Sequence, residues 1–160
     1  MKVFHGGTDV IDSPLADVGR ANLDFGPGFY VTDMYAQAIE WAKKVSIRRR
    51  LAPVVNCYEL QRDSFSCVYR CKVFLHYDAE WLDFIVDSRL GKQPWKQYDY
   101  IEGGIADDRV VDTINLYMAD LMTREKALER LSKHRPNNQM CFLSQSLIDK
   151  YLVYYGTDRI

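Results

Sequence analysis

Two short segments near the start of the chain combine residue types suited to holding a flat, electron-poor ring. Phe4-His5-Gly6 sets an imidazole beside a residue without a side chain, and Gly26-Pro27-Gly28-Phe29-Tyr30 ends a glycine-rich stretch on an aromatic residue. Aromatic faces attract such rings, so Tyr30 and Trp41 could sandwich one. The backbone of Gly6 and the His5 imidazole offer hydrogen-bonding groups. These features predict a ligand cleft that joins the two segments.

Residues 25–34 resemble the NAD-site signature of poly(ADP-ribose) polymerases and diphtheria-type toxins, in which glycine, any residue, glycine, an apolar residue and tyrosine follow one another. In this ADP-ribosyltransferase superfamily a strand ending in histidine-glycine comes first, as His5-Gly6 does here. A helix with a second aromatic follows, and Trp41 stands at that place. The chain is also similar, over nearly its full length, to a bacterial branch with a Leu-Asp-Phe-Gly-x-Gly-Phe-Tyr core and a late glutamine.

The resemblance implies NAD as the substrate and assigns roles to particular residues. His5 would orient a ribose, Tyr30 with Trp41 would stack the nicotinamide, and Gln139 would hold the 2′-hydroxyl side of the ribose. His5, Tyr30 and Gln139 are therefore the predicted catalytic residues. The residues predicted to bind NAD around them are Phe4, Gly6, Gly7, Arg20, Gly28, Phe29, Thr32 and Trp41.

The sequence departs from the polymerase pattern at two positions. A glutamate opens the late strand in the polymerases, and Gln139 stands there in this chain. A glutamine amide forms hydrogen bonds but cannot act as a general base. We therefore expect single transfer of ADP-ribose to a macromolecular acceptor that supplies its own nucleophile or is activated by Asp107 or Asp108. Ala38 replaces the serine that often holds the nicotinamide amide.

Other readings of the same residues stay open. The Gln139 departure motivates an inert module that binds NAD or ADP-ribose without turnover. Arg48, Arg49 and Arg50 motivate transfer to nucleic acid, or removal of a 2′-phosphate from RNA, although cations at the end of a helix also complement its dipole. Trp41 lies on an apolar helical stripe and fits a core position equally well.

Composition sets the class of protein and its expected setting. A chain of 160 residues predicts one domain over residues 1–160. The 21 lysine and arginine residues nearly balance 22 aspartate and glutamate residues, so no overall field favours nucleic acid or membranes. Without an apolar leader or spanning segment we expect a cytoplasmic protein with no membrane partner. The family likeness implies a toxin or effector with a neutralising antitoxin or immunity protein.

The cysteines give little reason to expect a metal or disulfides. Cys67, Cys71 and His76 could supply three ligands, but zinc sites usually have tighter pairs and a fourth ligand. We therefore expect no metal site.

The periodicity of the sequence predicts an α+β fold. A strand at Val3-Phe4 should deliver His5 to a glycine turn, and residues 8–24 should form a long loop. Asp33 should cap a helix that runs to about residue 50. Residues 54–60 and 68–74 alternate as a strand pair would. The resemblance makes this fold a split antiparallel β-sheet core with flanking helices.

The second half of the chain predicts mostly helices between short strands. A helix is expected over residues 79–89, a short strand over 98–101 and a helix that starts at 106–108. Thr123 should cap a further helix. Two closing strands are expected at residues 140–143 and 151–155, around a short turn or helix.

Overall fold

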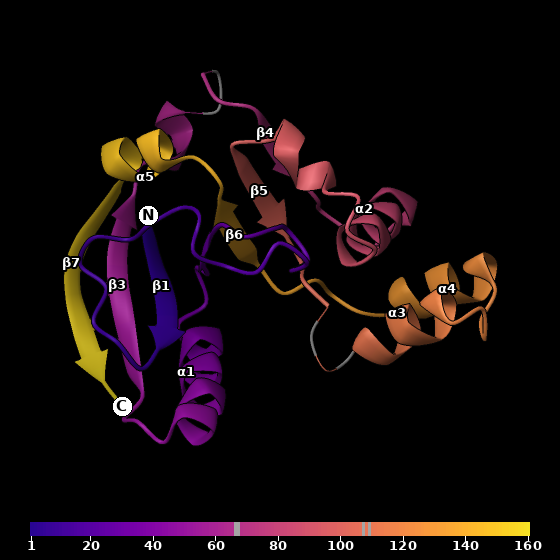
Figure 1. Ribbon diagram of the computed structural model, residues 1–160, viewed down its shortest axis with the longest axis horizontal. Coiled ribbons are helices and arrows are strands. Elements are labelled where there is room, and N and C mark those ends of the chain that lie inside the picture. The colour runs from indigo at the N-terminus through magenta and orange to yellow at the C-terminus, as the bar shows by residue number, and fades with distance from the viewer. Residues whose placement is uncertain (66–67, 107, 109) are drawn as a thin grey trace.

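The structure is a computed structural model that describes residues 1–65, 68–106, 108 and 110–160. Within these residues, strands and helices are mixed along the chain and the strands form two sheets (Figure 1). The predicted α+β class is confirmed at this level. No helix among the described residues has the length and apolar character needed to cross a membrane.

The first sheet has three antiparallel strands. Its centre is β3 (Val54–Leu60), with β1 (Lys2–Gly7) on one side and β7 (Leu152–Arg159) on the other. The 15-residue helix α1 (Tyr35–Arg49) lies against β1 and β3, where Ala38 and Ala42 are buried (Figure 1).

The second sheet has the order β2-β6-β5-β4. Its strands are β2 (Phe29–Val31), β4 (Cys71–Val73), β5 (Tyr100–Gly103) and β6 (Gln139–Phe142). The pairs β2–β6 and β5–β6 are antiparallel, but β4 runs parallel to β5. The parallel pair at this edge departs from the antiparallel sheet core that the resemblance implies.

The predicted pairing of residues 54–60 with 68–74 is also wrong, because the two segments belong to different sheets. The strand β3 is instead flanked by both ends of the chain. Alternation in the sequence identifies a strand but carries no information about its partner. Only Cys71–Val73 of the second segment is strand.

Three of the other helices pack on one face of the second sheet, and the last one contacts both β6 and β7. They are α2 (Ala79–Arg89), α3 (Val111–Met118), α4 (Arg124–Leu131) and α5 (Gln145–Tyr151), and short 3₁₀ turns occur at Arg62–Ser64 and Pro94–Gln97. The helix at residues 79–89 and the two closing strands around a helix are confirmed. The helix expected from 106–108 begins at Val111, and Asp107 lies outside the described residues.

Helix caps follow the sequence signals in part. Thr123 accepts a hydrogen bond from the backbone N–H of Lys126, which confirms its predicted cap. Asp33 is not the N-cap of α1, because the helix begins one residue later with Met34 as its cap. The Met34 N–H instead donates to the Thr32 hydroxyl at 3.1 Å.

Two clusters of buried residues lie on opposite faces of the second sheet. One contains Phe29, Val31 and Phe142 and includes residues of β1, β3 and α5. The other contains Ile101 and Cys141 and includes residues of α2, α3 and α4. Successive residues of a strand point to opposite faces, so β2, β5 and β6 each contribute to both clusters.

The long loop expected over residues 8–24 is confirmed as irregular backbone. Its first part is fastened to the first sheet by buried polar groups. The Asn56 side chain accepts from the Ile11 N–H and donates to the Asp9 carbonyl, and the Tyr58 hydroxyl donates to the Ile11 carbonyl at 2.6 Å. This loop is therefore held in place beside β1.

Candidate functional site

Three sequence segments that carry predicted site residues lie on neighbouring strands. A backbone bridge joins Phe4 of β1 to Thr32 at the end of β2. On the other side of β2, Val31 pairs with Met140, the second residue of β6. Gln139 opens β6 and is half-buried. The segments around residues 5, 30 and 139 are therefore brought together by the order β1, β2, β6.

His5 is tied to β2 by its side chain. Its Nδ1 atom lies 2.7 Å from the carbonyl oxygen of Tyr30, and its ring stacks on Phe29 with centroids 4.7 Å apart. A carbonyl only accepts hydrogen bonds, so Nδ1 carries the proton. Burial lowers the pKa of His5 below its ordinary value of 6.5, against the opposing effect of the hydrogen bond to Tyr30. The ring is thus neutral at pH 7, and its Nε2 atom has a free lone pair.

Gly7 leaves space beside that Nε2 atom. A Cβ atom on Gly7 would lie 3.6 Å from Nε2, which is ordinary van der Waals contact. The predicted turn at Gly6-Gly7 is wrong, because both glycines belong to β1. His5 therefore lies within β1 and not at its end.

Tyr30 fastens the glycine-rich turn that precedes it. Its hydroxyl donates to the Gly26 carbonyl at 2.8 Å and accepts from the Phe25 N–H at 3.1 Å. Burial, with a contribution from Cys141, raises the pKa of Tyr30 well above 10.0. The hydroxyl therefore stays protonated and is occupied by backbone, so it is not free to bind a ligand.

The His5 and Tyr30 side chains lie on opposite faces of the second sheet. His5 stacks on Phe29, which belongs to the core facing the first sheet, whereas Tyr30 packs on the cluster around α2 and α3. Cys141 pairs with Tyr30, and Gln139 lies two residues from Cys141, so Gln139 shares the face of Tyr30. A ligand that meets all three residues must be long enough to pass from one face to the other.

Two predicted ligand-binding glycines have structural reasons of their own. A Cβ atom on Gly6 would lie 2.0 Å from the Ala38 carbonyl oxygen of α1, and one on Gly28 would lie 2.4 Å from the Phe142 carbonyl oxygen of β6. Both glycines are required by close backbone packing. Their presence therefore does not depend on a ligand.

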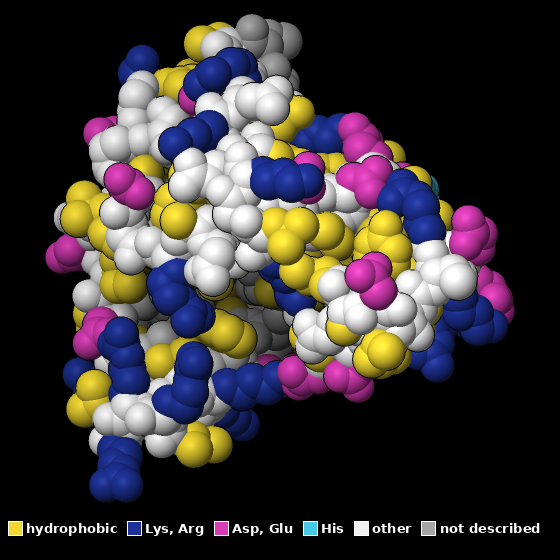
Figure 2. Space-filling view, turned by 45° about the vertical axis from the view of Figure 1, so that its right-hand side comes forward, with side chains coloured by type: hydrophobic (Ala, Val, Ile, Leu, Met, Phe, Trp, Pro, Cys, Tyr) yellow, Lys and Arg dark blue, Asp and Glu magenta, His cyan; other side chains and the backbone are white. Residues whose placement is uncertain are grey.

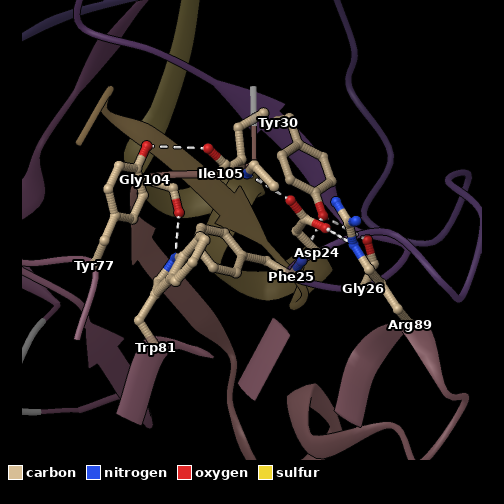
Figure 3. A network of polar contacts seen from close by, with 10 residues as sticks. Asp24, Phe25, Gly26, Tyr30, Tyr77, Trp81, Arg89, Gly104 and Ile105 are labelled. Atoms are coloured by element: carbon tan, nitrogen blue, oxygen red, sulfur yellow. Dashed lines mark hydrogen bonds and ion pairs between the residues drawn. The ribbon is translucent and has the colours of Figure 1, made fainter. Parts of the chain in front are cut away.

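A network of polar contacts surrounds the Tyr30 side of the site (Figure 3). The carboxylate of Asp24, which is mostly buried, accepts from the Arg89 Nε at 3.0 Å and from the backbone N–H of Ala106 at 2.8 Å. One side chain thus joins the turn before Tyr30, the end of α2 and the segment after β5. Asp24 belongs to the Leu-Asp-Phe-Gly run, but no role was predicted for it. A single acidic residue before Gly26 was the only signal in the sequence.

Further hydrogen bonds hold the backbone of the segment after β5. The Trp81 indole N–H donates to the Gly104 carbonyl at 2.6 Å, and the Tyr77 hydroxyl donates to the Ile105 carbonyl at 3.1 Å (Figure 3). The side chain of Asn137, just before β6, accepts from the Ile105 N–H at 2.8 Å. The backbone of residues 104–106 is therefore fixed opposite Tyr30 by side chains from three parts of the chain.

Trp41 lies on α1 and is 46% exposed. The Arg48 guanidinium lies 5.7 Å above its ring. The core residues of this helix are Ala38 and Ala42, so Trp41 is not the core residue that its stripe also allowed. Its contact with nicotinamide stays a prediction.

The remaining predicted ligand contacts have varied surroundings. Phe4 packs edge-on against Tyr35, and Phe29 is buried. The Thr32 side chain is buried and occupied by the Met34 N–H. Arg20 is exposed in a turn, where its side chain is accessible to a phosphate.

A buried carboxylate on the strand beside Gln139 is the second feature that the sequence did not indicate. Glu102 of β5 pairs with Met140 and is 8% exposed. Arg62 lies 2.6 Å from its carboxylate, and the Tyr100 hydroxyl donates to it at 2.8 Å. Glu102 occupies the face opposite to Gln139, because Met140 follows Gln139 in the strand. It therefore brings no negative charge to the Tyr30 face.

Figure 2 shows a hollow between the lysine- and arginine-rich end of α1 and the lobe that carries α3 and α4. The Lys44 ammonium lies 2.6 Å from the carboxylate of Asp108, which joins α1 to the segment before α3. Asp108 is exposed and paired with Lys44, and its expected role in activating the acceptor stays a prediction. Asp107 lies outside the described residues.

Two further hollows lie away from the predicted site. One, of about 450 Å³, is lined by residues at the start of α2 and the end of α4, including His76, Asp78 and His134. The other, of about 380 Å³, is lined by residues 117 and 120–124. Neither contains a predicted site residue. The described residues contain no cluster of three or more metal-ligating side chains, and Cys67 lies outside them.

Comparison with known proteins identifies the family of the chain. Residues 1–154 match the family described as "Protein of unknown function (DUF3990)", so the protein belongs to that family. No curated protein and no solved structure matches the chain.

Proposed function

We propose that this protein is an NAD-dependent mono-ADP-ribosyltransferase with an ADP-ribosyltransferase-like fold. The observation that carries the proposal is that β1, β2 and β6 adjoin, because a bridge joins Phe4 of β1 to Thr32 directly after β2, and β2 pairs with β6. It sets the His5-Gly6 segment, the Gly-Pro-Gly-Phe-Tyr segment and Gln139 side by side. These are the three segments that the resemblance to the superfamily assigns to NAD. They are far apart in the sequence, so their meeting was not required by the sequence pattern alone.

The state of His5 suits a ribose. Because Nδ1 donates to Tyr30, Nε2 can accept a hydrogen bond from a sugar hydroxyl. Gly7 itself adds no side chain beside this atom. A neutral imidazole held in one tautomer would orient one ribose of NAD from the face opposite to Gln139, without adding positive charge to the cationic cofactor.

In the proposed reaction the bond between ribose C1′ and the nicotinamide nitrogen breaks. The nicotinamide leaves as a neutral molecule with the electron pair of that bond, and positive charge develops on the ribose. The acceptor's nucleophile then forms the new bond to C1′ and releases its proton to solvent. The Gln139 amide would hold the ribose hydroxyls during this step. It cannot take the proton, so the acceptor must be nucleophilic by itself.

The proposal is tested by nicotinamide release and by transfer of label from NAD into a cell lysate. The native protein should release nicotinamide, and His5→Ala should reduce the rate by about tenfold to a hundredfold, as expected for the loss of a hydrogen bond made in the transition state. Arg135→Ala, at an exposed position after α4, is the control and should match the native protein. Equal rates for native protein and His5→Ala would overturn the proposed site.

A binding module without turnover is the second candidate, and the surroundings of Gln139 favour it. The buried carboxylate on the adjoining strand, Glu102, faces away and is paired with Arg62. In that case the protein binds NAD or ADP-ribose in a thermal-shift assay but releases no nicotinamide with any lysate. Nicotinamide release by the native protein would exclude this candidate.

A further inference from the structure

The C-terminal half of α1 carries a dense group of cations on the surface. We define the basic surface as Lys43, Lys44, Arg48, Arg49 and Arg50, all of which are exposed. Glu40 is the only acidic residue within α1. Dark blue side chains accordingly gather at this end of the molecule, at the margin of the hollow (Figure 2).

The helix dipole accounts for only part of this surface. Its attraction for cations falls off within the last turn, which here contains Arg48 and Arg49. Lys43 and Lys44 lie more than one turn earlier. The helix dipole therefore does not account for Lys43 and Lys44.

Ion pairs neutralise two of the five cations. Lys44 pairs with Asp108 and Arg49 pairs with Asp9 at 2.5 Å. The other three cations, which are Lys43, Arg48 and Arg50, have no ion-pair partner in the part of the chain that the structure describes. The basic surface thus keeps an excess of three positive charges.

The basic surface adjoins the proposed NAD site at two points. Arg49 donates to the hydroxyl of Thr8, which directly follows the strand of His5, Gly6 and Gly7. Lys44 reaches the segment after β5 through Asp108. A molecule bound on this surface would lie next to NAD held at His5 and Gln139.

We infer that the basic surface binds a nucleic-acid strand and presents it as the acceptor of ADP-ribose. This inference rests on the proposed function for its chemistry, but the binding itself does not need NAD. Unpaired cations along one helix suit a chain of phosphates, and the arginine fork matches phosphate geometry. Trp41 is 46% exposed at the start of the surface, and single-strand sites combine cations with aromatic side chains in this way.

The test measures binding by fluorescence anisotropy without NAD, using a labelled single-stranded RNA and DNA of about 16 nucleotides. The native protein should bind, and its affinity should fall as salt rises. The triple variant Lys43→Glu, Arg48→Glu and Arg50→Glu should bind at least about tenfold more weakly. A plot of the logarithm of its binding constant against the logarithm of the salt concentration should have a slope smaller by about two, because each of the three lost phosphate contacts contributes about 0.7. The milder variant with glutamine at the same three positions should lie between them.

The matched control reverses three cations at the end of another helix. Arg130, Lys133 and Arg135 are exposed at or after the last turn of α4, so their change to glutamate alters the net charge equally. The control should bind the oligonucleotides more tightly than the α1 variant does. Thermal unfolding of all variants identifies any that fail to fold. If the glutamate variant of α1 does not fold, the binding of the glutamine variant tests the inference.

Several results would overturn the inference. These are no binding by the native protein, equal weakening in the α1 and α4 variants, or equally strong binding of polyglutamate. Nicotinamide release by a native protein that binds no oligonucleotide would remove the inference and leave the proposed function intact. Binding that depends on the basic surface, in a protein that releases no nicotinamide, would overturn the proposed function and the acceptor role but retain the surface as a nucleic-acid site.

Discussion

His5 Nδ1 and the carbonyl oxygen of Tyr30 lie 2.7 Å apart although the residues are 25 positions apart in the chain. This contact crosses from β1 to β2, the two strands that also share the bridge at Phe4 and Thr32. It fixes the tautomer of the imidazole and connects the two sheets. The same hydrogen bond therefore serves both stability and the proposed chemistry.

Acid should destabilise the fold through His5. Because the pKa of His5 is lower in the folded protein than its ordinary value of 6.5, the unfolded chain binds the proton more readily. The contribution of His5 to the free energy of unfolding should therefore be complete above pH 6.5. It should fall as the pH is lowered from 6.5 toward the pKa of His5 in the folded protein, by at most about 1.4 kcal/mol per pH unit. Urea unfolding between pH 7 and 5 measures this.

His5→Asn keeps a donor for the Tyr30 carbonyl and removes the titration. This variant should show a smaller fall in stability across the same pH range, and His76→Asn, at an exposed position, accounts for the loss of an imidazole elsewhere. Identical pH slopes for native protein and His5→Asn would contradict the assignment.

Gly6→Ala should destabilise the protein by about 1–3 kcal/mol, the usual range for overpacking. The added Cβ would lie 2.0 Å from the Ala38 carbonyl oxygen and 2.9 Å from the Ala42 nitrogen, so α1 must shift. Gly156→Ala is the control, since a Cβ there meets nothing within 4 Å. The midpoints of urea unfolding give the comparison, and a Gly6→Ala variant as stable as Gly156→Ala would show that α1 does not pack this closely.

Tyr30→Phe should cost about 1–3 kcal/mol, because the Phe25 N–H loses its acceptor and the Gly26 carbonyl loses its donor. Tyr98→Phe is the matched control. Its ring packs against the same cluster, and its hydroxyl has no hydrogen bond within the described residues. Equal denaturant midpoints for the two variants would argue against the role of the Tyr30 hydroxyl in holding the turn.

Gln139→Glu should raise the rate of nicotinamide release by about tenfold or more, because a carboxylate stabilises the positive charge that develops on the ribose. The exposed position Gln97, changed to glutamate, provides a control with the same change of charge. Rates are measured at saturating NAD. A rate for Gln139→Glu that does not exceed the native rate would mean that position 139 is not beside the reacting ribose.

Local signals in the sequence were sufficient for most elements of the fold. The apolar stripe and Gly91 defined the helix at residues 79–89, and alternation defined β3. Pairing was not predictable, because β3 takes its partners from the two ends of the chain. Such contacts depend on the packing of the whole chain and leave no mark in a single segment.

The candidate site was predictable only where the resemblance supplied residues. His5, Tyr30 and Gln139 were named, and the strand order brings their segments together. Asp24 and Glu102 were not assigned roles, since each acts through partners distant in the sequence. A charged residue in a loop or short strand looks like a solvated one until its partners are known.

The packing of Gly6 on α1 changes what related sequences can reveal about function. Since a side chain at this position would collide with the Ala38 carbonyl, any relative with the same helix placement must keep glycine there, whether or not it binds a ligand. A relative that retains Gly6 but has lost an imidazole at position 5 would have inherited the architecture alone. Position 5, whose Nε2 atom makes no hydrogen bond within the described residues, is therefore a more informative marker of the proposed chemistry than position 6 among members of this family.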